Sequence, residues 1–239
     1  MTVLRLEEVS VRFKGREVLS SVSGEFGPGV HVVLGRNGAG KSTLFRAIAG
    51  LVDFEGEVYV DGRSLRRMSR REVARTVGYC WQNPYYGFIE QTVEEELRLI
   101  LEATGAPGDA RVVEILVPRE LMDRNPYTLS GGEAKRVSMA SVLVADQPVW
   151  LLDEPFSYLD RDGVSAVAEL VEYGRRRGKT ILVALHDTAY SSLLNPDSFT
   201  LLANGRFVAR GGWRELSDEV LASAGVATWV ELCGLESRR

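Results

Sequence analysis

One stretch of the chain has the residue types and order that phosphate binding requires, Gly35-Arg36-Asn37-Gly38-Ala39-Gly40-Lys41-Ser42-Thr43. It lies between an apolar run and a second, helix-like one, an order that predicts strand, glycine-rich loop and helix. Gly38 and Gly40 can take positive φ and turn several N–H groups toward one anion at a helix N-terminus. Lys41 would reach the β- and γ-phosphates of a nucleotide, and the Ser42 hydroxyl would bind Mg²⁺. The expected nucleotide ligands from this phosphate loop are Gly35, Asn37, Gly38, Ala39, Gly40, Lys41, Ser42 and Thr43.

A second part of the same site is expected where an apolar strand, 149–152, ends in two carboxylates. Asp153 stands at the carboxyl end of that strand, where it can hold the Mg²⁺ that Ser42 also binds. Glu154, the next residue, could accept a proton from a water molecule or orient that water against the γ-phosphate. The alternative is that the two carboxylates only cap a helix at the strand–helix junction.

Another candidate anion site is Leu129-Ser130-Gly131-Gly132-Glu133, which precedes a predicted helix at 134–145. A serine and two glycines at a helix N-terminus can bind phosphate, so Ser130, Gly131 and Gly132 are candidate ligands. The same residues also form an ordinary N-cap turn. Taken by itself, this motif leaves both interpretations open.

Composition limits the function classes. The 239 residues are 45% hydrophobic and 26% charged, as in a globular protein, and the net charge of -4 argues against a nucleic-acid partner. Cys80 and Cys233 are isolated and fit neither a disulfide framework nor a zinc site, so we expect Cys80 in the core. No apolar run reaches about 18 residues, and charge appears too early for a signal peptide. We therefore expect an intracellular protein that does not span a membrane but could sit on one through a partner.

Hydrophobic periodicity predicts an α/β fold with an antiparallel part and a parallel part. Alternation and turn residues place early antiparallel strands at 2–13, 18–19 and 57–61, followed by an arginine-rich segment, 63–75, that reads as a solvated face. Strands and helices alternate later in the chain, which implies a parallel sheet covered on both faces. These later elements are strands at 76–81, 149–152, 180–185 and 198–203, a helix at 161–176, a hairpin at Asn204-Gly205 into 207–209, and one or two short helices from Trp213 onward.

The middle of the chain, from Tyr85 to about Asp146, shows helical patterns only. One helix is expected to begin at the N-cap Thr92, and another spans 111–122 with an interruption at Pro118. Between strand and helix lies Tyr85-Tyr86-Gly87-Phe88-Ile89, which we term the aromatic loop. Exposed aromatic residues on a loop usually contact a partner, but they could also pack onto their own domain.

In their order and spacing, these motifs resemble those of the ATP-binding cassette (ABC) family of ATPases. Residues 129–133 resemble the family's signature loop, with Glu133 at the position of the usual glutamine. Gln82 falls at the glutamine of the family's Q-loop, which senses the γ-phosphate and the metal. His186 matches the switch histidine that follows a strand. Phe13 sits where the family places an aromatic residue that stacks on adenine.

The resemblance also assigns Ser157-Tyr158-Leu159-Asp160 to the D-loop, with Asp160 at the nucleotide interface unless it only caps the next helix. In this family two cassettes meet head to tail. Each ATP then lies between Lys41 and Ser42 of one subunit and Ser130 and Gly132 of the other. Such a dimer would explain why one chain carries two anion sites far apart in its sequence.

The implied fold is a P-loop NTPase core with a mostly parallel sheet, an N-terminal antiparallel β-subdomain and an inserted helical subdomain. It forms one domain, 1–239, with the nucleotide-binding core at 1–84 and 147–239 and the helical subdomain, including the signature loop, at 85–146. The implied ligands are ATP and Mg²⁺. Glu154, His186 and Gln82 would act in catalysis, and Gln82 would join Ser42 and Asp153 at the metal.

Within the family, Gln82-Asn83-Pro84 followed by Thr92-Val93-Glu94-Glu95-Glu96 looks like the energy-coupling factor (ECF) type of importer ATPase, whose substrates are vitamins and cobalt or nickel ions. That type commonly has acidic residues after Asn-Pro, where this chain has Tyr85-Tyr86-Gly87. The resemblance implies an ATPase on the cytoplasmic face of the cell membrane, bound to an integral membrane subunit and a second ATPase subunit, without nucleic acid.

The alternative is a soluble cassette ATPase without a channel, serving a scaffold or iron–sulfur assembly complex. Such proteins share every nucleotide-site motif named above, so only other parts of the chain can discriminate. A membrane helix needs an apolar groove, and the aromatic loop favours the transporter on that ground.

Overall fold

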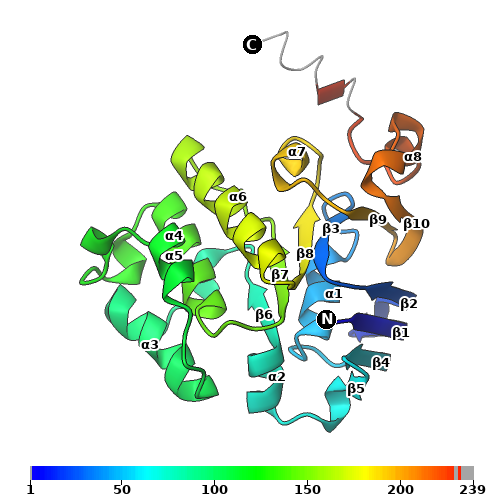
Figure 1. Cartoon of the computed structure of the whole chain (residues 1–239). Coiled ribbons are helices and arrows are strands. Elements are labelled where there is room, and N and C mark those ends of the chain that lie inside the picture. Colours follow the sequence, from blue (N-terminus) through cyan, green and yellow to red (C-terminus); the bar gives the residue numbers. More distant parts are fainter. Residues whose placement is uncertain (1, 229–230, 233–239) are drawn as a thin grey trace.

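The computed structural model describes residues 2–228 and 231–232, and a six-stranded sheet forms its centre (Figure 1). The strand order is β10-β9-β3-β8-β7-β6, and every neighbouring pair is parallel except β9 with β10. Its strands are β3 (Gly29–Leu34), β6 (Val77–Cys80), β7 (Val149–Asp153), β8 (Thr180–Leu185), β9 (Ser198–Ala203) and β10 (Arg206–Gly212). Every residue of β3, β6, β7 and β8 is buried, as expected for parallel strands covered on both faces.

A four-stranded antiparallel sheet, in the order β2-β1-β4-β5, stands beside the central one. It contains β1 (Leu4–Phe13), β2 (Arg16–Phe26), β4 (Glu55–Val60) and β5 (Arg63–Ser64). The predicted strand at 18–19 was too short, because polar serines in β2 hide its alternation from the sequence. The Ser20 N–H donates to the Gly205 carbonyl in the β9–β10 turn, so contacts with the other sheet help to hold this strand.

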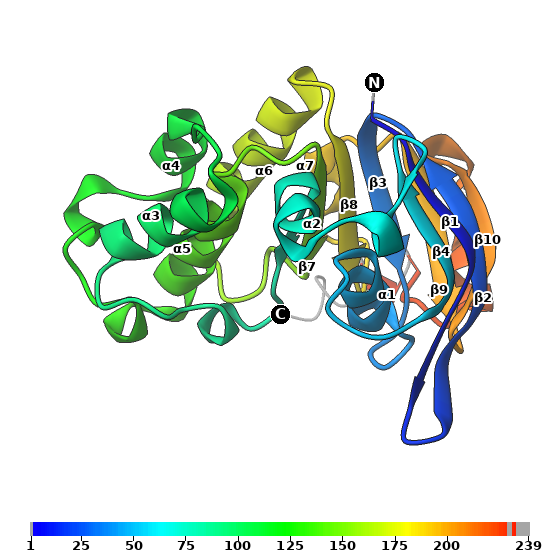
Figure 2. The ribbon, with the colours of Figure 1, turned by 90° about the horizontal axis from the view of Figure 1, so that it is seen from below.

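Helix α1 (Lys41–Ile48) connects the two sheets. Its residues Leu44, Phe45 and Ile48 are fully buried in a cluster that also contains β1, β3 and β7 side chains. The helix itself lies between the two sheets (Figure 2). Because α1 follows the phosphate loop directly, this apolar anchor fixes the position of the loop.

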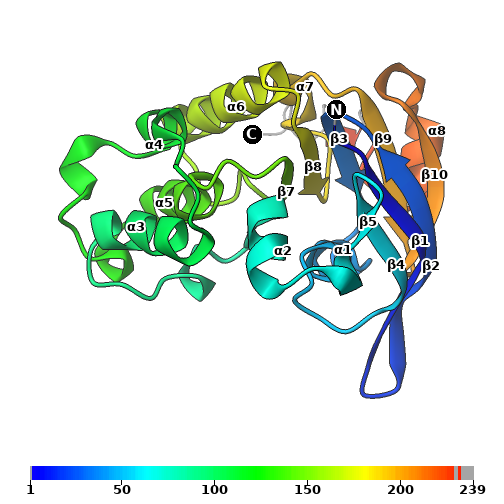
Figure 3. The ribbon, with the colours of Figure 1, turned by 60° about the horizontal axis from the view of Figure 1, so that its bottom comes forward.

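Residues 85–146, all of which the structure describes, form helices and no strand. The helices lie on the side of the central sheet away from β1 and β2 (Figure 3) and are α3 (Val93–Thr104), α4 (Ala110–Leu116) and α5 (Gly131–Leu143). The predicted helix at 111–122 was too long: α4 ends before Val117, which is extended because Pro118 follows it, and only a 3₁₀ turn continues. Helix α5 starts earlier than predicted, at Gly131. The mixed α/β fold class is confirmed, whereas the proposed subdomain boundaries stay a prediction.

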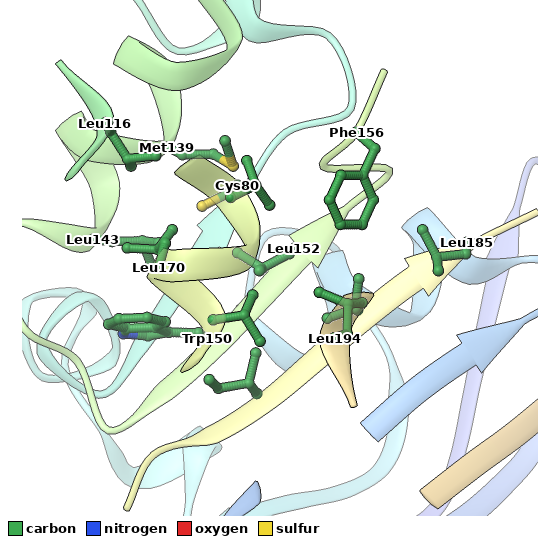
Figure 4. Packing of buried hydrophobic residues seen from close by; sticks show 14 of the residues in the cluster. Cys80, Leu116, Met139, Leu143, Trp150, Leu152, Phe156, Leu170, Leu185 and Leu194 are labelled. Carbon is green, nitrogen blue, oxygen red and sulfur yellow. The ribbon is translucent and has the colours of Figure 1, made fainter. Parts of the chain in front are cut away.

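The central core packs helix α6 (Arg161–Arg176) onto the sheet and onto α4 and α5. Cys80, Met139, Leu143, Trp150 and Leu170 meet in this cluster (Figure 4). Cys80 is buried, as predicted, and burial raises the pKa of its thiol to about 12. Cys233 lies outside the described residues.

Short helices complete the chain: α2 (Arg70–Thr76), α7 (Ser191–Leu194) and α8 (Asp218–Ser223). In the arginine-rich segment, Arg71 and Arg75 donate to the carbonyl of Thr104 at the end of α3, and Arg63 pairs with Glu72. These arginines therefore hold their own fold together. No helix within residues 2–228 and 231–232 is long and apolar enough to cross a membrane.

Gly174 lets α6 approach Trp150 closely, since a Cβ at Gly174 would lie 2.5 Å from the Trp150 ring. We expect Gly174→Ala to lower the free energy of unfolding by about 1–3 kcal/mol, because overpacking outweighs the helix propensity of alanine. Urea unfolding followed by tryptophan fluorescence measures this. Gly27→Ala is the control, because a Cβ there meets no described atom within 4 Å. Equal unfolding midpoints for the two variants would contradict the packing argument.

Candidate nucleotide-binding active site

The phosphate loop has the backbone that its sequence predicts. Gly38 and Gly40 take φ values of 81° and 110°, where other residues are strained. Gly35 has no room for a side chain, because a Cβ would lie 2.4 Å from the Leu202 carbonyl oxygen. Helix α1 begins at Lys41, so the loop presents backbone N–H groups at a helix N-terminus.

A pocket of about 310 Å³ opens over this loop. Its walls are Val18, Asn37, Gly38, Gly40, Lys41, Ser42, Thr43, Gln82 and Glu154. The fold thus brings Gln82, from the end of β6, and Glu154, from the end of β7, to the phosphate loop.

Lys41 is buried, and its ammonium donates to the Gly35 carbonyl at 2.6 Å and lies 3.5 Å from Glu154 Oε1. Burial lowers the pKa of Lys41, and the nearby carboxylate of Glu154 opposes that effect. Because the side chain already lies in the pocket, a phosphate there would meet a positioned cation.

Glu154 sits at a sharp turn, with its own φ at 47° in the left-handed region. Its N–H donates to the Ala184 carbonyl at 3.1 Å, and its Oε2 lies 2.8 Å from Nδ1 of His186. The other ring nitrogen of His186, Nε2, lies 3.2 Å from Asp187. This arrangement fixes the carboxylate at the pocket wall and places an imidazole beside it. Left-handed backbone at a non-glycine residue is strained, and such strain clusters at functional sites.

Asp153 is completely buried at the end of β7. Tyr79 donates from its hydroxyl to Oδ2 at 3.0 Å, and burial raises the pKa of this tyrosine. The other oxygen, Oδ1, has no hydrogen-bond partner among the described residues. A buried carboxylate oxygen without a partner, with the Ser42 hydroxyl in the adjoining pocket, is a donor set that suits a hard cation such as Mg²⁺.

Other predicted ligands lie outside this pocket. Phe13 is 44% exposed at the end of β1, and Asp160 caps α6 by accepting from the Gly163 N–H at 2.8 Å. Ser130, Gly131 and Gly132 form the start of α5, where the Ser130 side chain caps the helix. Tyr158 of the predicted D-loop packs on Gly131 and Gly132, since a Cβ at these glycines would lie 3.3 and 3.0 Å from it.

Two buried side chains that contact the site, Tyr79 and Lys135, were not predicted from the sequence. Tyr79 binds Asp153, and Lys135 donates to the backbone of Gln82 and Asp153. A lysine in a helix segment rich in small and apolar residues was a signal for the second one, since such a cation needs buried acceptors.

Comparison with known proteins decides the family. The model described as "ABC transporter" matches residues 19–157, more than half of the chain. The chain belongs to the ABC transporter family. It is an ABC ATPase, so it binds and hydrolyses ATP, as its sequence predicted.

Curated relatives extend this ABC assignment over most of the chain. The "Energy-coupling factor transporter ATP-binding protein EcfA1" of Thermotoga maritima is 35% identical over 219 residues, which cover 89% of this chain and 83% of that protein. The protein of the same name from Mycoplasma mobile is 37% identical over 202 residues, covering 81% and 73% of the two chains. The predicted resemblance to the ECF type is therefore confirmed.

Solved structures agree with the ABC fold. The "Structure of ATP binding subunit of ABC transporter" matches with a TM-score of 0.79 at 26% identity, over 99% of this chain and 100% of that one. A dimeric ATP-binding cassette in a post-hydrolysis state, bound to ADP and Pi, matches in fold with a TM-score of 0.75 at 22% identity over 87% and 98%.

We expect Lys41→Met to weaken ATP binding about 10- to 100-fold, because it removes a charge-assisted hydrogen bond to phosphate. Isothermal titration with ATP measures the dissociation constant. Arg36→Met is the matched control: it removes an exposed cation from the same loop that does not line this pocket. If the two variants bind ATP equally well, Lys41 is not the phosphate ligand.

Proposed function

We propose that this chain is the ATP-hydrolysing subunit of an ECF-type importer, which energises the uptake of a metal ion or a vitamin through a separate membrane subunit. One observation carries the catalytic part: Lys41, Gln82 and Glu154 line a single pocket over the phosphate loop. The ECF relatives support the type of transporter. In this role the chain would sit peripherally on the cytoplasmic face of the membrane.

The chemistry follows from the positions of the side chains. The loop N–H groups and Lys41 bind the β- and γ-phosphates of ATP and hold the γ-phosphorus in place for attack. Ser42, Asp153 and Gln82 would hold Mg²⁺, which when bound neutralises charge on the phosphate oxygens. Glu154 orients the attacking water and accepts its proton.

His186 assists this reaction through Glu154. Its Nδ1 lies 2.8 Å from the Glu154 carboxylate and therefore fixes the rotamer of the general base. Gln82 lies at the pocket wall, where its amide can contact the γ-phosphate or the water. Phe13 would stack on the adenine ring beyond the phosphates.

Two copies are needed for a complete site in this proposal. The signature loop does not line the pocket of its own chain, although Ser130, Gly131 and Gly132 present a helix N-terminus. In a head-to-tail dimer, this end of α5 would close on the γ-phosphate in the partner's pocket. Asp160 follows Tyr158 and Leu159, which pack on Gly132, and would lie at the same interface. The helical residues 85–146 would move as a subdomain.

This chain offers the membrane subunit a docking surface next to Gln82. A pocket of about 810 Å³ lies between the end of α1 and α2 and includes Leu51, Val73 and Trp81 in its walls. The aromatic loop stands nearby, since Tyr86 contacts the Trp81 ring edge-on. Both readings of that loop apply: Phe88 is buried in its own domain, whereas Tyr86 and Ile89 are 69% and 75% exposed. An apolar helix of the membrane subunit would cover these exposed side chains.

We expect Glu154→Gln to lower kcat for ATP hydrolysis about 10²- to 10⁴-fold, because the amide cannot accept a proton. ATP binding should persist, since Lys41 and the loop remain. A steady-state phosphate-release assay on the purified full-length chain measures the rate. Glu172→Gln, on the outer face of α6, should keep the wild-type rate. Hydrolysis by Glu154→Gln at the wild-type rate would remove Glu154 from the mechanism.

We expect Ile89→Asp to abolish copurification of a polytopic membrane protein while leaving ATP hydrolysis intact, because a charge on the apolar surface opposes helix docking. Tagged Glu154→Gln chains, with and without Ile89→Asp, are isolated with ATP in mild detergent and their partners identified, and ATP hydrolysis is measured separately on Ile89→Asp with Glu154 intact. Leu193→Asp, at an exposed leucine of α7, is the control. Soluble partners alone would refute the transporter and favour the scaffold ATPase.

A further inference from the structure

Lys135 in α5 is buried completely, and its ammonium group faces three backbone carbonyls. The acceptors are the carbonyl oxygens of Trp81 at 2.7 Å, Gln82 at 3.1 Å and Asp153 at 3.1 Å. A lysine ammonium has three donors, so this geometry uses all of them. Within the described part of the chain, Lys135 has no ion-pair partner within 4.0 Å.

These carbonyls belong to the peptide units that flank Gln82 and that precede Glu154. The peptide that joins Asp153 to Glu154 is held at both ends, by Lys135 on its carbonyl and by the Ala184 carbonyl on its N–H. The peptides on both sides of Gln82 are held through their carbonyls as well. One ammonium group thus fixes the backbone of the proposed general base and of the proposed phosphate sensor.

Lys135 belongs to α5, which begins at the signature loop and which we term the signature helix. Ser130 caps α5, and Lys135 follows it by little more than one helical turn. A second link joins the two segments nearby, because the Tyr85 hydroxyl donates to the Leu129 carbonyl at 3.2 Å. On one side of Asn83 the backbone is therefore tied to α5 through Lys135, and on the other side Tyr85 is tied to Leu129, just before the cap of α5.

The charge makes this link costly, which argues against a role as filler. Burial takes the ammonium out of water, a cost that the three carbonyl hydrogen bonds offset only in part. An apolar side chain of the same length would fill the space without that desolvation cost but would leave three carbonyls without donors. Lysine can donate to all three carbonyls at once and so fixes the orientation of three peptide units.

We propose that Lys135 is a positioning residue that sets Gln82 and Glu154 relative to the signature loop. The inference rests on the proposed function, in which the signature loop serves the ATP of the partner subunit. A shift of the signature helix, as that loop engages the partner's ATP, then moves the peptide units of this chain's own general base and sensor. Lys135 in this way links the two ATP sites of the dimer without touching either nucleotide.

Lys179 provides a matched control for the cost of a buried cation. It is also nearly buried, and its ammonium donates to the carbonyls of Asp146 at 2.9 Å and Gln147 at 2.8 Å and pairs with Asp146 Oδ1 at 2.6 Å. It stands just before β8, at the end of the sheet opposite to the phosphate loop. Removing its charge breaks two carbonyl hydrogen bonds and one ion pair away from the nucleotide, a loss at least as large as that of the three carbonyl hydrogen bonds of Lys135.

The test compares Lys135→Met, Lys135→Gln and Lys179→Met in the full-length chain by steady-state ATP hydrolysis, with Tm measured in parallel. We expect Lys135→Met to lower kcat about tenfold or more with KM for ATP within about threefold, because the phosphate loop is untouched. Lys135→Gln keeps two donors and should hold kcat within about threefold of wild type. Lys179→Met should lower Tm at least as much as Lys135→Met but keep kcat.

The inference is overturned if Lys135→Met and Lys179→Met have the same kcat, or if Lys135→Gln is as slow as Lys135→Met. If Lys135→Met does not fold, Tyr85→Phe replaces it: loss of the hydroxyl should lower kcat about threefold or more, while Tyr173→Phe, whose hydroxyl binds Asp109, should not. Equal rates for the two phenylalanine variants also overturn it. Absence of hydrolysis by the wild-type chain would instead refute the proposed function.

Discussion

The register of the parallel sheet is the constraint on which the site depends. Leu34 of β3 pairs with Leu185 of β8, and Asp153 of β7 pairs with Ala184, so these strands end at the same edge. Strand β6 ends beside them, where Cys80 pairs with Leu152. The phosphate loop, Gln82, Asp153 with Glu154, and His186 each follow one of these four ends. Parallel pairing therefore gathers groups from distant parts of the sequence, as in other open α/β sheets.

This edge of the sheet contains buried charges and strained backbone that lower the stability of the chain without a ligand. Lys41 and Glu154 are both buried and lie close together, while Asp153 keeps an oxygen without a partner. Glu154 is held in strained backbone. Each feature costs stability in the isolated chain, and bound phosphate and metal would relieve the first two by adding opposite charges. The apolar clusters on both faces of the sheet supply the stability that offsets these costs.

The sequence predicted the elements whose signal is local. Continuous apolar runs marked β3, β7 and β8, and the glycines of the phosphate loop marked the anion site. Prediction failed where tertiary contacts decide the structure: β2 depends on its neighbours rather than on alternation, and α4 ends early because of Pro118. Tyr79 and Lys135 were missed because their roles appear only when β6, β7 and α5 are packed together.

Helix α5 runs from the molecular surface to the backbone behind the nucleotide pocket. Its N-terminus presents Ser130 and two glycines at the surface, away from the pocket of its own chain. Little more than a turn later, Lys135 donates to the backbone behind that pocket. A rigid helix cannot shift at one of these points and stay fixed at the other. A partner that shifts the start of α5 would therefore also move the backbone of Gln82 and Glu154, so the geometry of one chain contains a route from the surface of this helix to the nucleotide pocket.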